Sequence, residues 1–213
     1  MSAMFIMLEG GEGAGKTTLA GNLERALQKK GHEVLRTREP GGTPWGEKIR
    51  NLLIAKHEDI DHSLTPMSQL MGYYMARFEN LERVILPALR AGKTVISDRF
   101  ELSSYAYQVH AQGDAQLEAL FLDLHRHVSE LLRPFECVYI LCDVHPDLGL
   151  ARVKERGETE SAFDAEHIEF HHKVREGMMR AQGHLDPAFR CVVIDASRSR
   201  EEVLADALKA FHE

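Results

Sequence analysis

The sequence predicts an open, parallel, three-layer α/β fold formed by a single domain over residues 1–213. Short apolar runs alternate with longer segments whose apolar residues recur at helical spacing, which is typical of a sheet with helices on both faces. Three runs, at 94–98, 136–142 and 190–194, are apolar through their centres, as expected of strands covered on both faces. Sheets of this kind bind ligands beyond the carboxyl ends of their strands, so we expect the functional residues there.

The pattern places each element in turn. Strands are expected at 4–8, 33–37, 94–98, 136–142 and 190–194. A long helix is expected between the second and third strands, and another at the C-terminus, because apolar residues recur there every three or four positions. Gly31 and Gly92 stand where helices should end, and Ser199 should cap the last helix ahead of Glu201 and Glu202. The apolar helical positions are Met67, Leu70, Met71, Tyr74, Phe78, Leu81 and Ile85, and then Val203, Leu204, Ala207, Leu208 and Phe211.

Composition narrows the functional classes. A hydrophobic content of 44% and a charged content of 28% are typical of a globular protein. The net charge of −7 argues against a protein that binds nucleic acid or a membrane surface. The chain has no 18-residue apolar run and no signal-peptide pattern, so a cytoplasmic location is expected. The three cysteines lack metal-binding spacing and are expected to be buried and reduced. His167 and His171 are four residues apart, but the H-E-x-x-H pattern is absent, so no structural metal is expected.

A glycine-rich segment follows the first expected strand. Its residues, Gly10-Gly11-Glu12-Gly13-Ala14-Gly15-Lys16-Thr17-Thr18, fit the phosphate-binding pattern G-x-x-x-x-G-K-[ST] between a strand and a helix. The glycines let several backbone N–H groups point inward, and the following helix adds a partial positive charge. Lys16 would reach the β- and γ-phosphates, and the Thr17 hydroxyl would hold Mg²⁺. The sequence therefore predicts a nucleoside triphosphate site formed by these residues.

Two further segments stand at strand ends. Residues 37–44, Thr-Arg-Glu-Pro-Gly-Gly-Thr-Pro, would form a fixed turn that presents Arg38 and Glu39 at the functional edge. After the third strand, Asp98 could hold Mg²⁺ and Arg99 could clamp a phosphate with two hydrogen bonds. The alternative is a local salt bridge between Asp98 and Arg99.

The polar segment 155–165 has no apolar periodicity. It is either a solvated loop or a mobile lid, and phosphoryl transfer favours a lid because the site must exclude water. We interpret residues 152–165 as this lid.

These motifs, together with Ala76-Arg77 and Ala106-Tyr107-Gln108 in their order and spacing, make the chain resemble thymidylate kinases of the bacterial type from about residue 4 onward. The resemblance implies the P-loop nucleoside monophosphate kinase fold, with a five-stranded parallel sheet surrounded by helices. It also implies transfer of the γ-phosphoryl group of ATP to dTMP, giving dTDP and ADP for dTTP synthesis, with Mg²⁺. A homodimer is implied as well.

The same resemblance assigns roles to single residues. Glu12 would face the 3′-hydroxyl of the acceptor, and Arg38 and Arg99 would hold its phosphate. Tyr73, where the family usually has Phe, would stack on the base. At the base edge and the sugar the implied contacts are Arg77, which donates to the base, Ser104, which reads the pyrimidine ring, Tyr107, which crowds the 2′ position, and the neighbouring Gln108.

Two arginines are expected at the edge of the lid. The P-loop has Gly13 where some members carry a basic residue, and bacterial-type members compensate with lid arginines. Arg156 would then neutralise charge on the moving phosphoryl group, and Arg152 would contact ATP. Together with Lys16 and Arg99, these charges would drive catalysis by alignment and neutralisation without a general base, because the attacking phosphate oxygen is already ionised.

Three departures from the family pattern are expected at the base pocket: Tyr73 with Gly72 opening space beside it, Tyr105 in place of Gln, and residues 109–113 in place of a glycine-rich run. They leave open a kinase for a 5-modified dUMP, such as 5-hydroxymethyl-dUMP, or for another deoxynucleoside monophosphate.

Other functional classes fit the sequence less well. A GTPase switch would need an Asn-Lys-x-Asp motif, which the sequence lacks. A protein that binds nucleotide without turnover would not need Lys16, Thr17, Asp98 and Arg99 together. A deoxynucleoside kinase would need a general base, and Glu39 is the one evident candidate.

Overall fold

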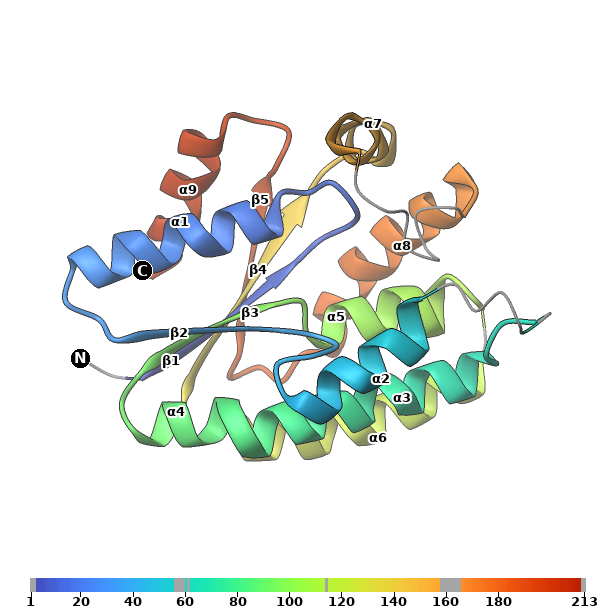
Figure 1. Ribbon diagram of the computed structural model, residues 1–213, viewed down its shortest axis with the longest axis horizontal. Helices are drawn as coiled ribbons and strands as arrows, with labels where there is room; N and C mark the ends of the chain where they lie inside the picture. Colours follow the sequence, from blue (N-terminus) through green and yellow to red (C-terminus); the bar gives the residue numbers. More distant parts are fainter. Residues whose placement is uncertain (1–2, 56–59, 61, 114, 158–165, 212–213) are drawn as a thin grey trace.

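The computed structural model describes residues 3–55, 60, 62–113, 115–157 and 166–211. A five-stranded sheet lies at its centre in the order β2-β3-β1-β4-β5, and every neighbouring pair is parallel (Figure 1). The predicted α/β fold is confirmed, and the strand bounds differ from the expected ones by one residue at most. The strands are β1 Met4–Glu9, β2 Val34–Arg38, β3 Thr94–Asp98, β4 Glu136–Asp143 and β5 Arg190–Asp195.

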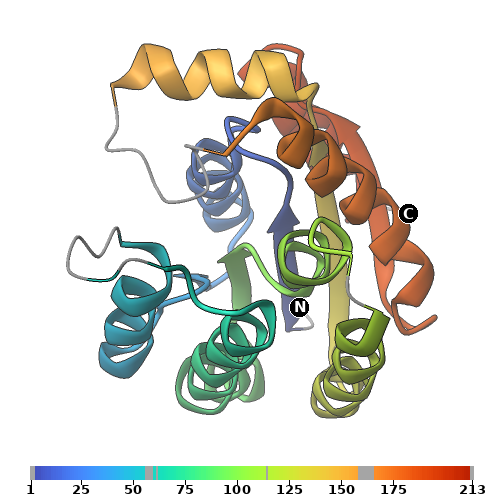
Figure 2. The same cartoon turned by 90° about the vertical axis from the view of Figure 1, so that its right-hand side faces the viewer.

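Helices cover both faces of the sheet. One face carries α1 and α9, and the other carries α3, α4 and α6, while α2 packs on α3 (Figures 1 and 2). α7 and α8 follow β4 and lie beside each other. The helical elements are α1 Lys16–Lys29, α2 Pro44–Ile54, α3 Pro66–Asn80, η1 Leu81–Ile85, α4 Leu86–Arg90, α5 Glu101–Ser104, η2 Tyr105–His110, α6 Ala115–Leu132, α7 Pro146–Arg156, α8 Ile168–Ala181, η3 Gln182–His184 and α9 Arg200–Lys209.

The alternation of side chains along β1 divides the interior into two cores. Ile6 and Leu8 pack with α1 and α9, whereas Phe5 and Met7 pack with α3, α4 and α6. All four are fully buried. A strand covered on both faces needs apolar residues at every position, which explains the continuous apolar run that predicted β1.

The expected helix ends are confirmed. Gly31 (φ 86°) and Gly92 (φ 82°) take the left-handed conformation that follows α1 and α4. At the start of α9 the Ser199 hydroxyl accepts a hydrogen bond from the Glu202 N–H, and the Glu202 carboxylate accepts one from the Ser199 N–H. This reciprocal cap fixes the start of α9.

The expectation that the run at 190–194 is covered on both faces is wrong. β5 lies at the edge of the sheet, Cys191 is only partly buried, and Val193 is 44% exposed. The apolar composition reflects β propensity as much as burial, and sequence does not separate the two. Met67 and Met71 are likewise exposed on α3.

Only part of the predicted lid lies among the described residues. Its first residues, 152–156, belong to α7, and residues 158–165 lie outside the described residues. Among the residues that are described, we find no helix long and apolar enough to span a membrane.

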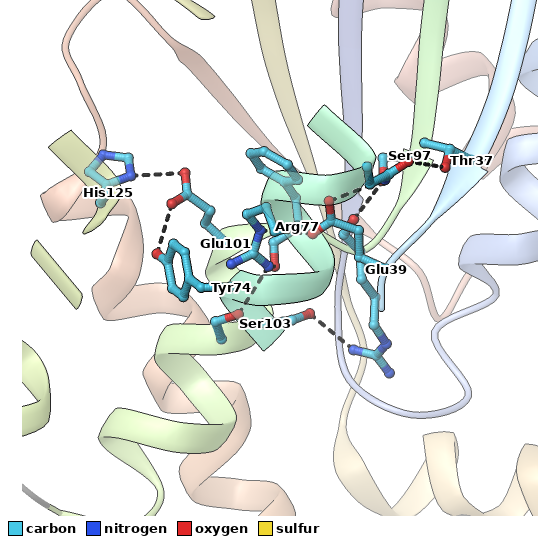
Figure 3. Close-up of polar contacts among 12 residues, drawn as sticks. Thr37, Glu39, Tyr74, Arg77, Ser97, Glu101, Ser103 and His125 are labelled. Carbon is cyan, nitrogen blue, oxygen red and sulfur yellow. Dashed lines mark hydrogen bonds and ion pairs between the residues drawn. The ribbon is translucent and has the colours of Figure 1, made fainter. Parts of the chain in front are cut away.

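A buried carboxylate ties three helical elements together behind the sheet's functional edge. Glu101, at the start of α5, is fully buried. Its carboxylate accepts hydrogen bonds from the Tyr74 hydroxyl of α3 at 2.8 Å and from His125 Nδ1 of α6 at 3.0 Å (Figure 3). Burial opposes charge on His125, but the Glu101 carboxylate raises its pKa above the ordinary value. α5 is thereby held between α3 and α6.

We predict that Tyr74→Phe lowers the free energy of unfolding by about 1–3 kcal/mol, because it leaves part of the buried carboxylate without a donor. Tyr105→Phe is the matched control: both tyrosines are 1% exposed and donate to a glutamate at 2.8 Å. The Glu118 acceptor of Tyr105 has a side chain that is 35% exposed, so water can replace the lost hydroxyl. Urea unfolding measures both, and equal losses would contradict the role assigned to Glu101.

Candidate active site

The glycine-rich loop between β1 and α1 has the backbone of a phosphate-binding loop. Gly13 (φ 68°) and Gly15 (φ 78°) are left-handed, and a Cβ at Gly13 would lie 2.0 Å from the Gly149 carbonyl of α7, so only glycine fits there. The Lys16 ammonium donates hydrogen bonds to the carbonyls of Gly10 at 2.9 Å and Gly11 at 2.8 Å. Burial lowers the pKa of Lys16. The ammonium is thus held at the rim of the loop, where phosphate oxygens would replace the carbonyls.

Thr17 and Asp98 meet although 81 residues separate them. The Thr17 hydroxyl donates to Asp98 Oδ2 at 2.6 Å, because β1 and β3 are neighbours and both strands end at this edge. A hydroxyl and a carboxylate beside a phosphate loop are oxygen donors of the kind that Mg²⁺ prefers, so these residues fit the ion. Asp98 therefore pairs with Thr17, and the local salt bridge to Arg99 is not formed.

Arg99 pairs instead with the P-loop carboxylate. Its Nη2 lies 2.6 Å from Glu12 Oε1, the Tyr107 hydroxyl donates to the same oxygen at 2.9 Å, and the guanidinium lies over the Tyr107 ring. Burial works against the charge on Glu12, but Arg99 and Lys16 outweigh it and lower the pKa of Glu12 to about 2. Three residues predicted separately therefore form one charged cluster.

The backbone at Arg99 is held in an unusual conformation. Arg99 has φ 72°, a left-handed conformation that is costly for a side chain with a Cβ. The Glu9 carboxylate accepts hydrogen bonds from the Phe100 N–H (2.9 Å), the Ser103 N–H (3.2 Å) and the Ser103 hydroxyl (2.5 Å). Sequence reasoning missed Glu9. Its signal was a glutamate that ends an apolar strand directly before the P-loop.

A cavity of about 340 Å³ opens at this edge. It brings together most of the predicted P-loop, acceptor and lid residues. The residues of its wall that the sequence analysis missed include Arg50 and Ile54 of α2 and Ser103 of α5. Arg50 donates to the Pro40 carbonyl at 3.0 Å and carries no sequence signal. The predicted residues that line the cavity are Glu12, Gly13, Gly15, Lys16, Thr17, Thr18, Arg38, Tyr73, Asp98, Arg99, Tyr107, Gln108 and Arg156.

A second cavity, of about 560 Å³, adjoins the first across the P-loop. Arg156 lines both, and Ala14 and Arg152 line the second. Arg152 donates to the carbonyls of Ala196 at 2.8 Å and Ser197 at 3.1 Å, which anchors α7 to the loop after β5. The missed residues here include Arg198, from the loop before α9. Two cavities that share a phosphate loop suit two phosphorylated ligands.

Arg77 and Ser104 lie behind the first cavity and do not line it as the described residues form it. Arg77 is 1% exposed; its Nε donates to Glu39 Oε2 at 2.7 Å, and its Nη2 donates to Ser104 Oγ at 3.0 Å. The remaining nitrogen, Nη1, finds no acceptor among the residues that the structure describes. The predicted pair is therefore assembled, with the Glu39 carboxylate as its contact to the cavity wall.

The expectation that the three departures lie at the base pocket is wrong for two of them. Tyr105 packs in the core against Phe121, with the ring centroids 5.2 Å apart, and Val109 is buried in the same core, so neither faces the cavity. Gly72 opens no space, because a Cβ there would lie 2.8 Å from the Leu53 side chain of α2. Successive side chains of a helix point in different directions, and among these described positions only Tyr73 lines the cavity. Arg38 lies at the exposed rim, where its Nη2 donates to Glu47 at 2.8 Å.

Comparison with known proteins agrees with this geometry. Residues 8–207 match the family model described as thymidylate kinase. The chain is 38% identical over 207 residues to a thymidylate kinase of Halalkalibacterium halodurans, covering 96% of this chain and 94% of that one. It is 40% identical over 212 residues to one of Gluconobacter oxydans, covering 99% and 94%.

A solved structure leads to the same family. The crystal structure of thymidylate kinase from Ehrlichia chaffeensis superposes with a TM-score of 0.72 at 29% identity and covers all of both chains. Sequence, fold and site thus agree, and the chain belongs to the thymidylate kinase family.

Proposed function

We propose that the protein transfers the γ-phosphoryl group of ATP to dTMP, giving dTDP and ADP. The observation that carries this proposal is the cluster of Lys16, Glu12 and Arg99 in the first cavity, which shares Gly13, Gly15, Thr18 and Arg156 with the second. ATP would occupy the second cavity with its phosphates on the P-loop, and dTMP would occupy the first. The family of the chain supports both substrates.

The chain's own groups would bind both phosphates and neutralise their charge. Arg99 and Arg38 would hold the acceptor phosphate, whose second pKa of about 6 leaves an ionised oxygen to attack the γ-phosphorus. Lys16 and Arg156 would neutralise charge on the transferred group as the bond to ADP breaks. Thr17 and Asp98 would hold Mg²⁺, which when bound neutralises phosphate charge. The cavity walls would exclude water and limit hydrolysis.

The nucleoside would lie between Tyr73 and Gln108. Tyr73 would stack on the base, while Tyr107, fixed to Glu12, would crowd the 2′ position and favour deoxyribose. Arg77 would orient the Glu39 carboxylate in the cavity wall through their hydrogen bond, and Ser104 would hold Arg77 in place by accepting a hydrogen bond from it. The departures that suggested a 5-modified acceptor do not reach the cavity, apart from Tyr73, so dTMP is the acceptor we propose.

The remaining parts of the proposal concern the lid and the assembly. Arg156 reaches both cavities from α7, which supports a lid over 152–165 in a single domain. The homodimer is proposed from the family. An exposed apolar row on α3 supports it, formed by Met67, Met71 and Met75. Sedimentation velocity measures the assembly. A cytoplasmic location remains a prediction.

ADP release measured with dTMP, dUMP, 5-hydroxymethyl-dUMP, dCMP, dGMP and dAMP in parallel tests the proposed acceptor. We expect the highest kcat/KM with dTMP. A preference for 5-hydroxymethyl-dUMP would overturn the choice of base and leave the transfer reaction standing, while no turnover with any acceptor would overturn the proposed function.

We predict that Lys16→Ala and Arg156→Ala each remove most turnover, because each deletes a positive charge at the transferred phosphoryl group; for the arginine we expect a loss of roughly 10³–10⁵ in kcat. Acceptor binding to the Arg156 variant should stay within a few-fold of the wild type by calorimetry. Lys154→Ala is the control, an exposed cation on the same helix. Normal turnover by Arg156→Ala would show that the lid assignment is wrong.

We predict that Glu12→Gln lowers kcat/KM for dTMP far more than for 3′-deoxy-dTMP. The reason is that the Glu12 carboxylate, besides pairing with Arg99, is proposed to bind the 3′-hydroxyl of the acceptor. A coupling of about tenfold between the side chain and the hydroxyl is expected, as for a hydrogen bond to a charged group. Steady-state kinetics of both enzymes with both acceptors measure it. Equal losses with the two acceptors would mean that Glu12 acts through Arg99 alone.

A further inference from the structure

Three side chains with metal-binding atoms meet on the surface between α7 and α8. His145 precedes α7, Asp147 lies in its first turn, and His172 lies on α8 (Figures 1 and 2 show the two helices side by side). We propose that these residues form a binding site for a divalent transition metal of the zinc class. The site is separate from the Thr17–Asp98 pair and does not depend on the proposed function.

The geometry is close to that of a bound ion. One ligand atom from each of the three residues lies within 4.8 Å of the other two. Ligands on a tetrahedral zinc ion, with bonds of about 2.1 Å, lie about 3.4 Å apart. His145 Nδ1 and Asp147 Oδ2 are already 3.1 Å apart, and the two imidazole rings are 5.3 Å apart between centroids. Because all three side chains are exposed, small rotamer changes complete the arrangement.

The backbone beneath the cluster is already fixed. Arg175, one turn after His172, donates two hydrogen bonds of 2.7 Å to the Asp143 carboxylate at the end of β4. Residues three apart share a helix face, so this pair holds the His172 face of α8 toward the β4–α7 junction. The ligands therefore come from two elements whose separation does not have to change on binding.

The donor set decides which metal binds. Two imidazoles and one carboxylate suit Zn²⁺, Co²⁺ or Ni²⁺, with the fourth position left to water. Mg²⁺ prefers oxygen ligands and retains its waters, so the Mg²⁺ that accompanies ATP would not compete. The ion would tie the start of α7 to α8. Arg152 and Arg156 lie further along the same α7.

Titration of the metal-free, full-length protein with Co²⁺ in excess Mg²⁺ tests the site, because bound Co²⁺ absorbs visible light. We expect one equivalent to bind the wild type, and His145→Ala and His172→Ala to weaken binding by at least about tenfold, the loss seen even when a residue that only supports a ligand is removed. His167→Ala, an exposed histidine at the start of the same α8, should bind as the wild type does.

A second readout is thermal unfolding with and without Zn²⁺. Zn²⁺ should raise the Tm of the wild type and of His167→Ala, and leave that of His145→Ala and His172→Ala unchanged. The Tm of each variant without metal shows that it is folded. No stoichiometric binding by the wild type, or binding and stabilisation that the two ligand variants retain, would overturn the proposal.

Discussion

The Glu9 carboxylate fixes the relation between the two phosphate-binding segments. It ends β1 immediately before the P-loop and accepts three hydrogen bonds, one from Phe100 in the turn after β3 and two from Ser103 of α5. That turn carries Arg99 in a left-handed conformation that costs on the order of 1–3 kcal/mol, which the three bonds offset. A buried residue on one strand therefore sets where the arginine stands relative to Lys16, and transfer between two phosphates depends on that distance.

Glu39 and Glu101 extend the same principle away from the P-loop. Burial raises the pKa of Glu39 to about 7, with Arg77 and Asn80 opposing it through a 2.7 Å ion pair and a hydrogen bond. Glu101 joins α5 to α3 and α6. Buried charges of this kind are costly to desolvate, so their benefit is geometric: each holds one particular arrangement of helices around the cavity. The apolar cores determine that the chain folds, and these carboxylates determine how the cavity wall is placed.

Charge is distributed unevenly over the molecule. The chain carries a net charge of −7, yet Arg38, Arg50, Arg99 and Arg156 line one cavity together with Lys16. Opposing carboxylates neutralise part of this group, as Glu12 does for Arg99 and Glu47 does for Arg38. A phosphorylated ligand would exchange these intramolecular pairs for its own, so the cluster stays stable without ligand and remains able to bind one. The concentration of cations, and not the overall charge, is what suits the site to nucleotides.

The sequence by itself determined the sheet, the P-loop and the residues at the strand ends, because apolar periodicity and the glycine-rich loop are local signals. It also predicted Thr17 and Asp98 at the same edge of the sheet, where parallel strands end, and their side chains meet there. Only the tertiary structure decided which face of a helical run meets the cavity, so Arg77 lies behind the wall and Tyr105 lies in the core. It alone brought His145 to His172, 27 positions later in the chain. The physical reason is that such contacts depend on helix rotation and on packing between distant segments, which no local pattern encodes.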